Sequence, residues 1–293
     1  MLDALLEYEF LRNAFWAGMI IGIVSPVVGV FLVVRRLSLM ADALSHIALS
    51  GVAAGMLLRE VSPAFAFFNP VYAGMAFSVA GSLFVEQLRK LYRSYEELAI
   101  PITLSTGVAL GVVLISIADG FNSDLFGYLF GSVLSVTPSD LMAIGGIGLV
   151  VLLAVFVFYK ELFYLSYDEE NAVLSGLPRK ALNVLYMVLV ALVIAAAMRI
   201  VGILLVSAMM TLPVAASLQV ARSFKQTFLY AVGFAETSVL GGLTLSYYLD
   251  WASGGTIVLL SVTILAITLT FKRLKRRLVS RRVLSSGQEA GHC

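Results

Sequence analysis

The chain has 293 residues, of which 60% are hydrophobic and only 13% are charged, and its formal net charge is +2. Soluble domains carry charge on roughly a quarter of their residues, so this composition excludes an ordinary soluble protein and indicates a polytopic all-α membrane protein. The single cysteine, Cys293, excludes a disulfide framework or a thiolate cluster within one chain.

Apolar runs with the length of a membrane-spanning helix recur along the whole chain. A span needs roughly 20 apolar residues, because the hydrocarbon core of a bilayer is about 30 Å thick. The apolar segment 125–139 is shorter, which favours a re-entrant or half-membrane helix. About nine transmembrane helices (eight to ten) are expected, at 14–34, 39–58, 61–85, 98–118, 141–159, 181–198, 200–221, 226–249 and 251–271.

Lysine and arginine gather in alternate connections between these spans. Cytoplasmic loops carry an excess of these residues, so the bias predicts a multi-pass protein with a cytoplasmic C-terminus. Residues 1–276 form the expected transmembrane domain, and residues 277–293 form a basic and polar cytoplasmic tail that we expect to be disordered beside membrane lipid. The basic groups on this side are Arg35 and Arg36, the cluster 89–93, Lys160, Arg179 and Lys180, Arg222 and Lys225, and the tail from Lys272 to Arg282.

The segment LSLMADALSHIAL, residues 37–49, places two costly polar groups inside an expected span. Asp42 and His46 are four residues apart, so their side chains lie on one face of a helix. A rise of about 1.5 Å per residue from Arg36 puts His46 about 15 Å into the membrane, near its middle. A charge at this depth costs about 2.5–3.5 kcal/mol on insertion scales, so this pair is a functional candidate.

A carboxylate and an imidazole together form a donor set that suits zinc or manganese. Two ligands cannot close a tetrahedral site, but the same helix of a second copy would supply two more. The spacing alone leaves two other interpretations open. The pair can instead hold helices together through a hydrogen bond or ion pair, or it can relay protons, because histidine titrates near neutrality.

Two further polar residues interrupt apolar runs. Glu236 lies in the middle of the expected span 226–249, where a protonated carboxyl or a hydrogen bond to Thr237, Ser238 or a neighbouring helix is the simplest interpretation. Arg199 is the only charge between residues 181 and 221, and it marks a tight outer hairpin. An acidic loop residue is the partner that we expect if Arg199 forms an ion pair.

The connection KELFYLSYDEENAVLSGLPRK, residues 160–180, contains the signals of a short cytoplasmic helix. Acidic residues occupy its first turn, small residues recur four apart, and a proline follows the last glycine. A short helix held between two spans is a lever that another protein can push. The residues expected to couple the chain to such a partner are Asp168, Glu170, Ala172 and Gly176.

Five stretches spread over residues 33–260 together resemble the integral-membrane permeases of ABC transporters that import zinc, manganese or iron with a cluster A-I type binding protein. They are VVRRLSLMADALSHIALSGVAAG, DLFGYLFGSVLSVTPSD, YDEENAVLSGLP, RIVGILLVSAMMTLPVAAS and LSYYLDWASGGTIVLL. The resemblance implies a type II importer fold, a homodimeric pore, a separate ATPase subunit docked on the 168–176 helix of each chain, and an extracellular metal-binding protein. It also implies that Asp42 and His46 are metal ligands. Asn171 departs from the family pattern, in which alanine is common at that position.

These observations predict the permease subunit of an ATP-driven metal importer in the bacterial cell membrane, with zinc favoured over manganese or iron as cargo. No GxxxxGK[ST] motif and no Gly-Lys pair occur, so ATP hydrolysis must come from another subunit and the chain itself is not expected to be an enzyme. No permanent cofactor and no nucleic-acid partner are expected. The alternatives are a permease for an organic metal chelate, which would not need paired pore ligands, and a proton-coupled secondary transporter, which would use Glu236 and His46 as titrating groups but would not need the coupling segment.

Overall fold

The computed structural model describes residues 8–61, 69–92, 94–118, 123–132 and 136–289, and every regular element in these ranges is a helix. The protein is therefore all-α, as the composition predicts. The helices are α2 (Glu9–Val34), α3 (Ser38–Val61), α4 (Pro70–Leu91), η2 (Glu96–Leu98), α5 (Ala99–Ile117), α6 (Ser123–Phe130), α7 (Pro138–Val157), α8 (Tyr159–Tyr167), α9 (Glu169–Leu174), α10 (Arg179–Ala197), α11 (Val206–Val220), α12 (Phe224–Leu249) and α13 (Ser253–Glu289).

Eight segments within the described ranges are long and apolar enough to cross a membrane, and this confirms the polytopic architecture. They comprise α2, α3, α4, η2 with α5, α7, α10, α12, and α13 as far as Lys275. The ninth expected span, 200–221, is only partly helical, because α11 begins at Val206 and has 15 residues. Each of the nine expected positions therefore contains a helix, but one of these helices is shorter than a full span.

The shortening of α11 has a local cause in the segment 198–205. Gly202 has φ +87, and a Cβ placed on it would lie 2.4 Å from the carbonyl oxygen of Leu129, so only glycine fits there. The backbone N–H of Ile203 donates to the carbonyl of Tyr128 at 2.8 Å, and the Ser253 hydroxyl donates to the carbonyl of Ile200 at 2.8 Å. These bonds satisfy a buried, non-helical backbone, which a membrane protein tolerates only inside protein.

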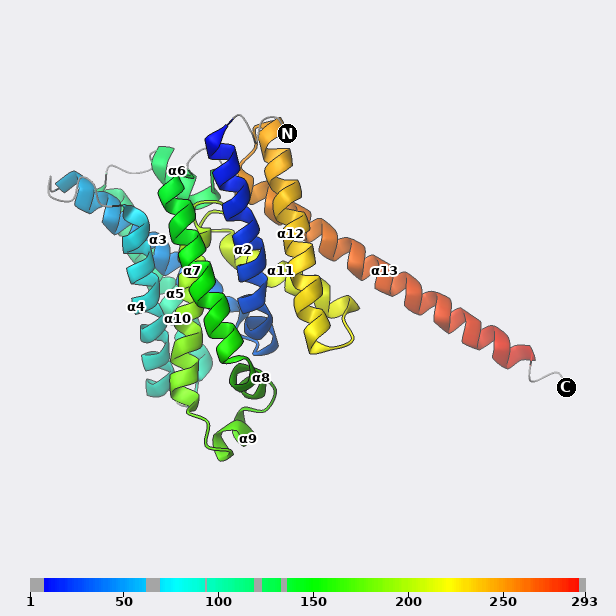
Figure 1. Ribbon diagram of the computed structural model, residues 1–293. Coiled ribbons are helices and arrows are strands. Elements are labelled where there is room, and N and C mark those ends of the chain that lie inside the picture. The colour runs from blue at the N-terminus through cyan, green and yellow to red at the C-terminus, as the bar shows by residue number, and fades with distance from the viewer. Residues whose placement is uncertain (1–7, 62–68, 93, 119–122, 133–135, 290–293) are drawn as a thin grey trace.

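The helix α2 lies between α7 and α12 and packs against both (Figure 1). The hydroxyl of Tyr186 on α10 donates to the carbonyl of Val28 at 2.9 Å, inside the turn that precedes Phe31. The ring of Phe31 in turn contacts Tyr159 on α8 and Phe228 on α12, with centroids 6.3 and 5.4 Å away. One segment of α2 thus joins three other helices at the end of the bundle that carries α9.

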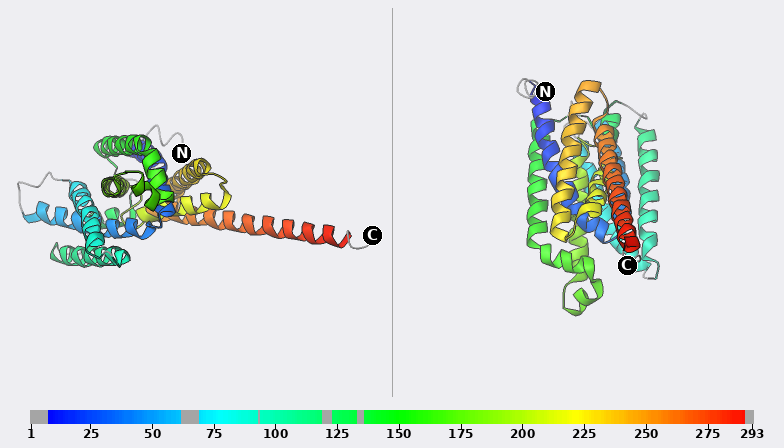
Figure 2. Two further views of the ribbon diagram at one scale, coloured as in Figure 1. Left: turned by 90° about the horizontal axis from the view of Figure 1, so that it is seen from below. Right: turned by 90° about the vertical axis from the view of Figure 1, so that its right-hand side faces the viewer.

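The last helix, α13, leaves the bundle at an angle and projects far beyond it (Figures 1 and 2). It continues as a helix across residue 276, where we placed the end of the transmembrane domain. The division of the chain into a transmembrane domain and a disordered tail stays a prediction.

Candidate metal site and coupling segment

The helix that carries Asp42 and His46, α3, is held against α5 by backbone contacts. A Cβ placed on Gly107 of α5 would lie 2.9 Å from the backbone nitrogen of Ile47 and 3.1 Å from the carbonyl carbon of His46. The Ser50 hydroxyl also donates to the carbonyl of Gly107 at 2.6 Å. The two helices therefore touch through main-chain atoms at the level of His46.

On another side, α4 approaches α3 equally closely. A Cβ on Gly51 would lie 2.6 Å from the carbonyl oxygen of Ala73, and one on Gly74 would lie 2.8 Å from Val52. Small residues at such contacts let membrane helices approach until their backbones pack. Because these contacts contain few flexible side chains, α4 and α5 fix the rotation and the height of α3.

The two predicted ligands are half-buried on this fixed helix. Within the described part of the chain, neither the Asp42 carboxylate nor the His46 imidazole makes a hydrogen bond, and no ion pair joins them. No cluster of three or more histidine, cysteine, aspartate or glutamate side chains that could hold a metal occurs among the described residues. One chain therefore offers two neighbouring donors but not a complete coordination sphere.

The coupling segment forms α9, a six-residue helix at one end of the bundle (Figure 1). The Asp168 carboxylate accepts hydrogen bonds from the backbone N–H of Asn171 at 3.0 Å and from the Asn171 amide, and this lowers the pKa of Asp168. Ala172 is fully buried against Leu165 of α8 and Leu182 of α10. The side chain of Glu170 lies outside the described residues.

Gly176 ends the coupling segment in a left-handed conformation, with φ +83. The N–H of Leu177 returns to the carbonyl of Ala172 at 3.2 Å, which closes the end of α9. Leu174 points outward and is 83% exposed. Of the predicted coupling residues, Asp168, Ala172 and Gly176 therefore shape and seat α9. Among the described side chains of this helix, Leu174 presents the exposed apolar surface, and the sequence pattern did not single it out.

Arg199 lies just after α10 and connects several elements. Its guanidinium donates to Asn69 Oδ1 at 3.2 Å, lies 3.8 Å from a carboxylate oxygen of Asp140, and covers the ring of Tyr128 at 4.9 Å. The ion-pair partner is thus Asp140, an acidic residue that precedes the expected span 141–159 and that the structure places in the first turn of α7. Thr137 and Asp140 form a capping box that begins α7, a signal that is visible in the sequence Thr-Pro-Ser-Asp.

Glu236 lies on α12 where this helix touches α2. A Cβ on Gly22 of α2 would lie 2.6 Å from Glu236 Oε1. Thr237 and Ser238 donate instead to carbonyls one turn earlier on α12, those of Gly233 and Phe234. Both carboxyl oxygens of Glu236 are buried, and among the described residues they have no hydrogen-bond partner. A hydrogen bond from Glu236 to Thr237, Ser238 or a neighbouring helix is therefore not formed within the described ranges, and the alternative of a protonated carboxyl stays a prediction.

The chain is similar to membrane subunits of known metal transport systems. It is 35% identical over 269 residues to the manganese transport system membrane protein MntC of Halalkalibacterium halodurans, which covers 92% of this chain and 89% of the relative. It is 30% identical over 267 residues to the high-affinity zinc uptake system membrane protein ZnuB of Haemophilus influenzae, covering 91% and 98% of the two chains.

A solved structure has the same fold. PsaBC from Streptococcus pneumoniae, determined in complex with Fab, superposes with a TM-score of 0.79 at 33% identity and covers 91% of this chain and 93% of that one. The sequence profile of the ABC 3 transport family matches residues 7–272, which is most of the chain. This protein is therefore a member of the ABC 3 transport family and a multi-pass membrane permease of the metal-transporting ABC type.

Proposed function

We propose that this chain is the permease subunit of an ATP-driven importer of divalent transition-metal ions, in which Asp42 and His46 bind the passing ion. The observation that carries this proposal is the fixed position of α3. Its backbone is held by α4 and α5 at the level of His46, while the Asp42 and His46 side chains have no hydrogen-bond partner in the described ranges. Metal-donor atoms that are fixed in position and are not engaged in hydrogen bonds are available to bind an ion that arrives from outside the chain.

Two copies of the chain complete the proposed site. A twofold axis beside α3 brings together two carboxylates and two imidazoles, the number of ligands that a tetrahedral zinc site needs. These groups replace water ligands that the ion loses on entering the membrane. Binding must also be weak enough for release, because conduction requires a site that the ion can leave.

The energy comes from a separate ATPase that docks on α9. We propose that Leu174 is its apolar contact and that Ala172 passes the movement to α8 and α10, against which it is buried. An extracellular metal-binding protein delivers the ion at the opposite end of the bundle. This arrangement requires α9 and the C-terminus to be cytoplasmic, as the distribution of basic residues predicts.

Zinc and manganese are the two candidates for the cargo. The Asp/His donor set and the Irving–Williams order favour zinc at a site common to both ions. The manganese protein MntC is more similar to this chain than the zinc protein ZnuB, at 35% against 30% identity, and this supports manganese as the second candidate.

Uptake by membrane vesicles tests the proposal. The vesicles contain the chain with its ATPase and its binding protein, and labelled zinc and manganese are offered separately. We expect ATP-dependent uptake of one ion, and we expect His46→Ala or Asp42→Asn to abolish it. Ser45→Ala is the matched control, because the Ser45 hydroxyl donates only to the Ala41 carbonyl on the same helix.

Two results would contradict the proposal. If His46→Ala transports as well as Ser45→Ala, the pair is structural and binds no cargo. If uptake ignores ATP and collapses with the proton gradient, the chain works as a secondary transporter.

A further inference from the structure

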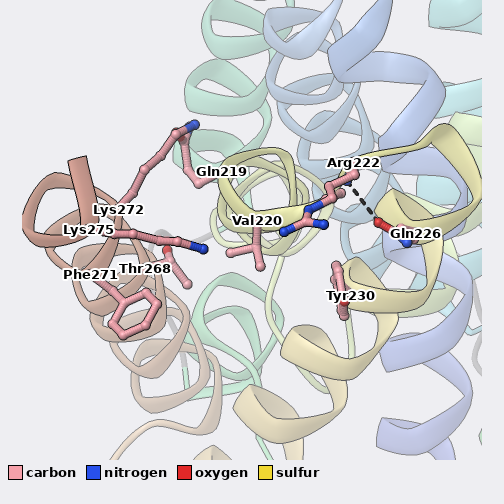
Figure 3. A pocket seen from close by; sticks show the side chains of 10 residues that line it. Gln219, Val220, Arg222, Gln226, Tyr230, Thr268, Phe271, Lys272 and Lys275 are labelled. Carbon is pink, nitrogen blue, oxygen red and sulfur yellow. Dashed lines mark hydrogen bonds between the residues drawn. The ribbon is translucent and has the colours of Figure 1, made fainter. Parts of the chain in front are cut away.

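A groove of about 780 Å³ opens between the end of α11, the start of α12 and the middle of α13 (Figure 3). Its volume lies within the range of roughly 300–1,000 Å³ that is typical of small-molecule sites. The α11–α12 connection lies at the same end of the bundle as α9 (Figure 1). The functional site described above uses none of the residues that line this groove.

Among the described residues, all the charged side chains that line the groove are basic. Arg222 comes from the α11–α12 connection, and Lys272 and Lys275 come from α13, while none of the described lining residues is acidic. The Lys272 ammonium donates to Gln219 Oε1 at 3.0 Å. In the described ranges, the Arg222 guanidinium and the Lys275 ammonium make no hydrogen bond or ion pair, and they point toward one another from opposite walls (Figure 3).

The groove is also apolar along one side. Phe271, which is 69% exposed, and Tyr230 line it below the basic groups in the view of Figure 3. The groove lies where spans end, because α11 stops at Val220 and the apolar span of α13 stops at Lys275. A site with cations beside exposed rings at the end of the spans matches a molecule that is anionic at one end and apolar at the other.

We propose that this groove binds an anionic phospholipid, with the phosphate between Arg222 and Lys275 and the acyl chains along Phe271 and Tyr230. Basic pockets between transmembrane helices hold anionic headgroups because the attraction acts at the surface where such lipids are concentrated. A soluble anion would gain nothing from the two aromatic rings. A second copy of the chain would have to bring an acidic group to the same place.

Titration of fluorescent phosphatidylglycerol onto the purified full-length chain in neutral detergent tests the proposal. We expect Arg222→Gln with Lys275→Gln to raise the dissociation constant about 25-fold, at about fivefold for each charge removed. The matched control is Lys225→Gln with Arg273→Gln, which removes two exposed charges from α12 and α13 that do not line the groove. We expect this control to stay within about twofold of the wild type.

Three results would overturn the proposal. Equal losses in both double variants would show that diffuse charge attracts the lipid. Displacement of the lipid by inorganic phosphate would assign the groove to a soluble anion. If the unsubstituted chain does not bind the lipid, and Phe271→Cys with Cys293→Ser forms a disulfide between copies, a second copy covers the groove. The exchange Arg222→Lys with Lys275→Arg keeps both charges. If it binds the lipid while the double glutamine variant does not, the glutamine variant has lost the two charges that bind the lipid rather than its fold.

Discussion

Replacing Gly107 with alanine tests whether the contact between α3 and α5 positions the proposed metal ligands. The added Cβ would lie 2.9 Å from the backbone nitrogen of Ile47 and 3.1 Å from the carbonyl carbon of His46. Comfortable contacts between carbon atoms are about 3.5–4.0 Å long, so the helices must separate locally by about 0.5–1 Å. The Ile47 side chain also lies 2.9 Å from this position, but the other two obstructing atoms belong to the backbone, so a change of rotamer alone cannot relieve the clash.

The size of the effect follows from two opposing contributions. Overpacking of this kind costs about 1–3 kcal/mol. Alanine is intrinsically better than glycine in a helix by about 0.8–1 kcal/mol, so the net loss of stability should be about 0–2 kcal/mol. Ligands must be held within about 0.5 Å of their productive positions. Changes to the groups that orient metal ligands typically cost about 10–100-fold in affinity, so the separation should weaken metal binding by about tenfold or more.

Two other glycines provide a graded control for this substitution. A Cβ on Gly111, one turn further along α5, would meet the Ser50 hydroxyl at 3.3 Å, and a Cβ on Gly146 of α7 would meet nothing within 4 Å. Thermal unfolding in detergent and titration with zinc and manganese should rank alanine at position 107 as most harmful, 111 as intermediate and 146 as neutral or stabilising. If Gly107→Ala matches Gly146→Ala in both measurements, the clamp on α3 does not position the ligands.

Three further substitutions probe other parts of the molecule. Hydrogen bonds from Asn171 lower the pKa of Asp168 in the folded protein, so the stability that Asp168 gives α9 should be present at neutral pH and disappear as the pH falls below about 4. Amide hydrogen exchange of residues 169–174 should show this acid-dependent loss. The variant Asp168→Ala should lack protection of these amides at every pH. Arg199→Met should destabilise the protein by about 3 kcal/mol, because it leaves the buried Asp140 carboxylate without its ion pair. Adding Asp140→Asn should recover part of the lost unfolding temperature. Equal unfolding temperatures for the single and double variants would contradict this prediction. Glu236→Gln should retain ATP-driven uptake, because both carboxyl oxygens are buried without a donor among the described residues and a neutral amide of similar size fits the same space. Loss of uptake would instead show that the carboxylate itself takes part in transport.

The sequence predicts the helices well because the bilayer fixes their length. A run of roughly 20 apolar residues has few other uses in a protein, so each expected span contains a helix. The start of α11 is the exception. It depends on Gly202 and on the pairing of Ile203 with Tyr128, a residue 75 positions away. Such pairing depends on contacts between distant parts of the chain, which apolar periodicity does not report.

The candidate site could be predicted only in part for a similar reason. The i, i+4 spacing of Asp42 and His46 is a local property of one helix, so the sequence contains it completely. The contact of Gly107 with the backbone of α3 and the ion pair of Arg199 with Asp140 each join two distant segments. The sequence did not predict the exposure of Leu174 on α9, because small residues four apart indicate only the buried face of a helix.

A chain of close contacts connects α9, through α10 and α4, to α3, the helix that carries Asp42 and His46. Ala172 of α9 is buried against Leu182 of α10. At the far end of α10, Met198 lies 3.2 Å from the position of a Cβ on Gly74 of α4, and Val52 of α3 lies 2.8 Å from the same position. Interiors packed at this density resist small relative shifts, so neighbouring helices tend to move as units. If an ATPase moves α9, α10 and α4 should therefore displace α3 as a whole, and the Asp42 and His46 side chains should change position relative to a second copy rather than relative to their own helix.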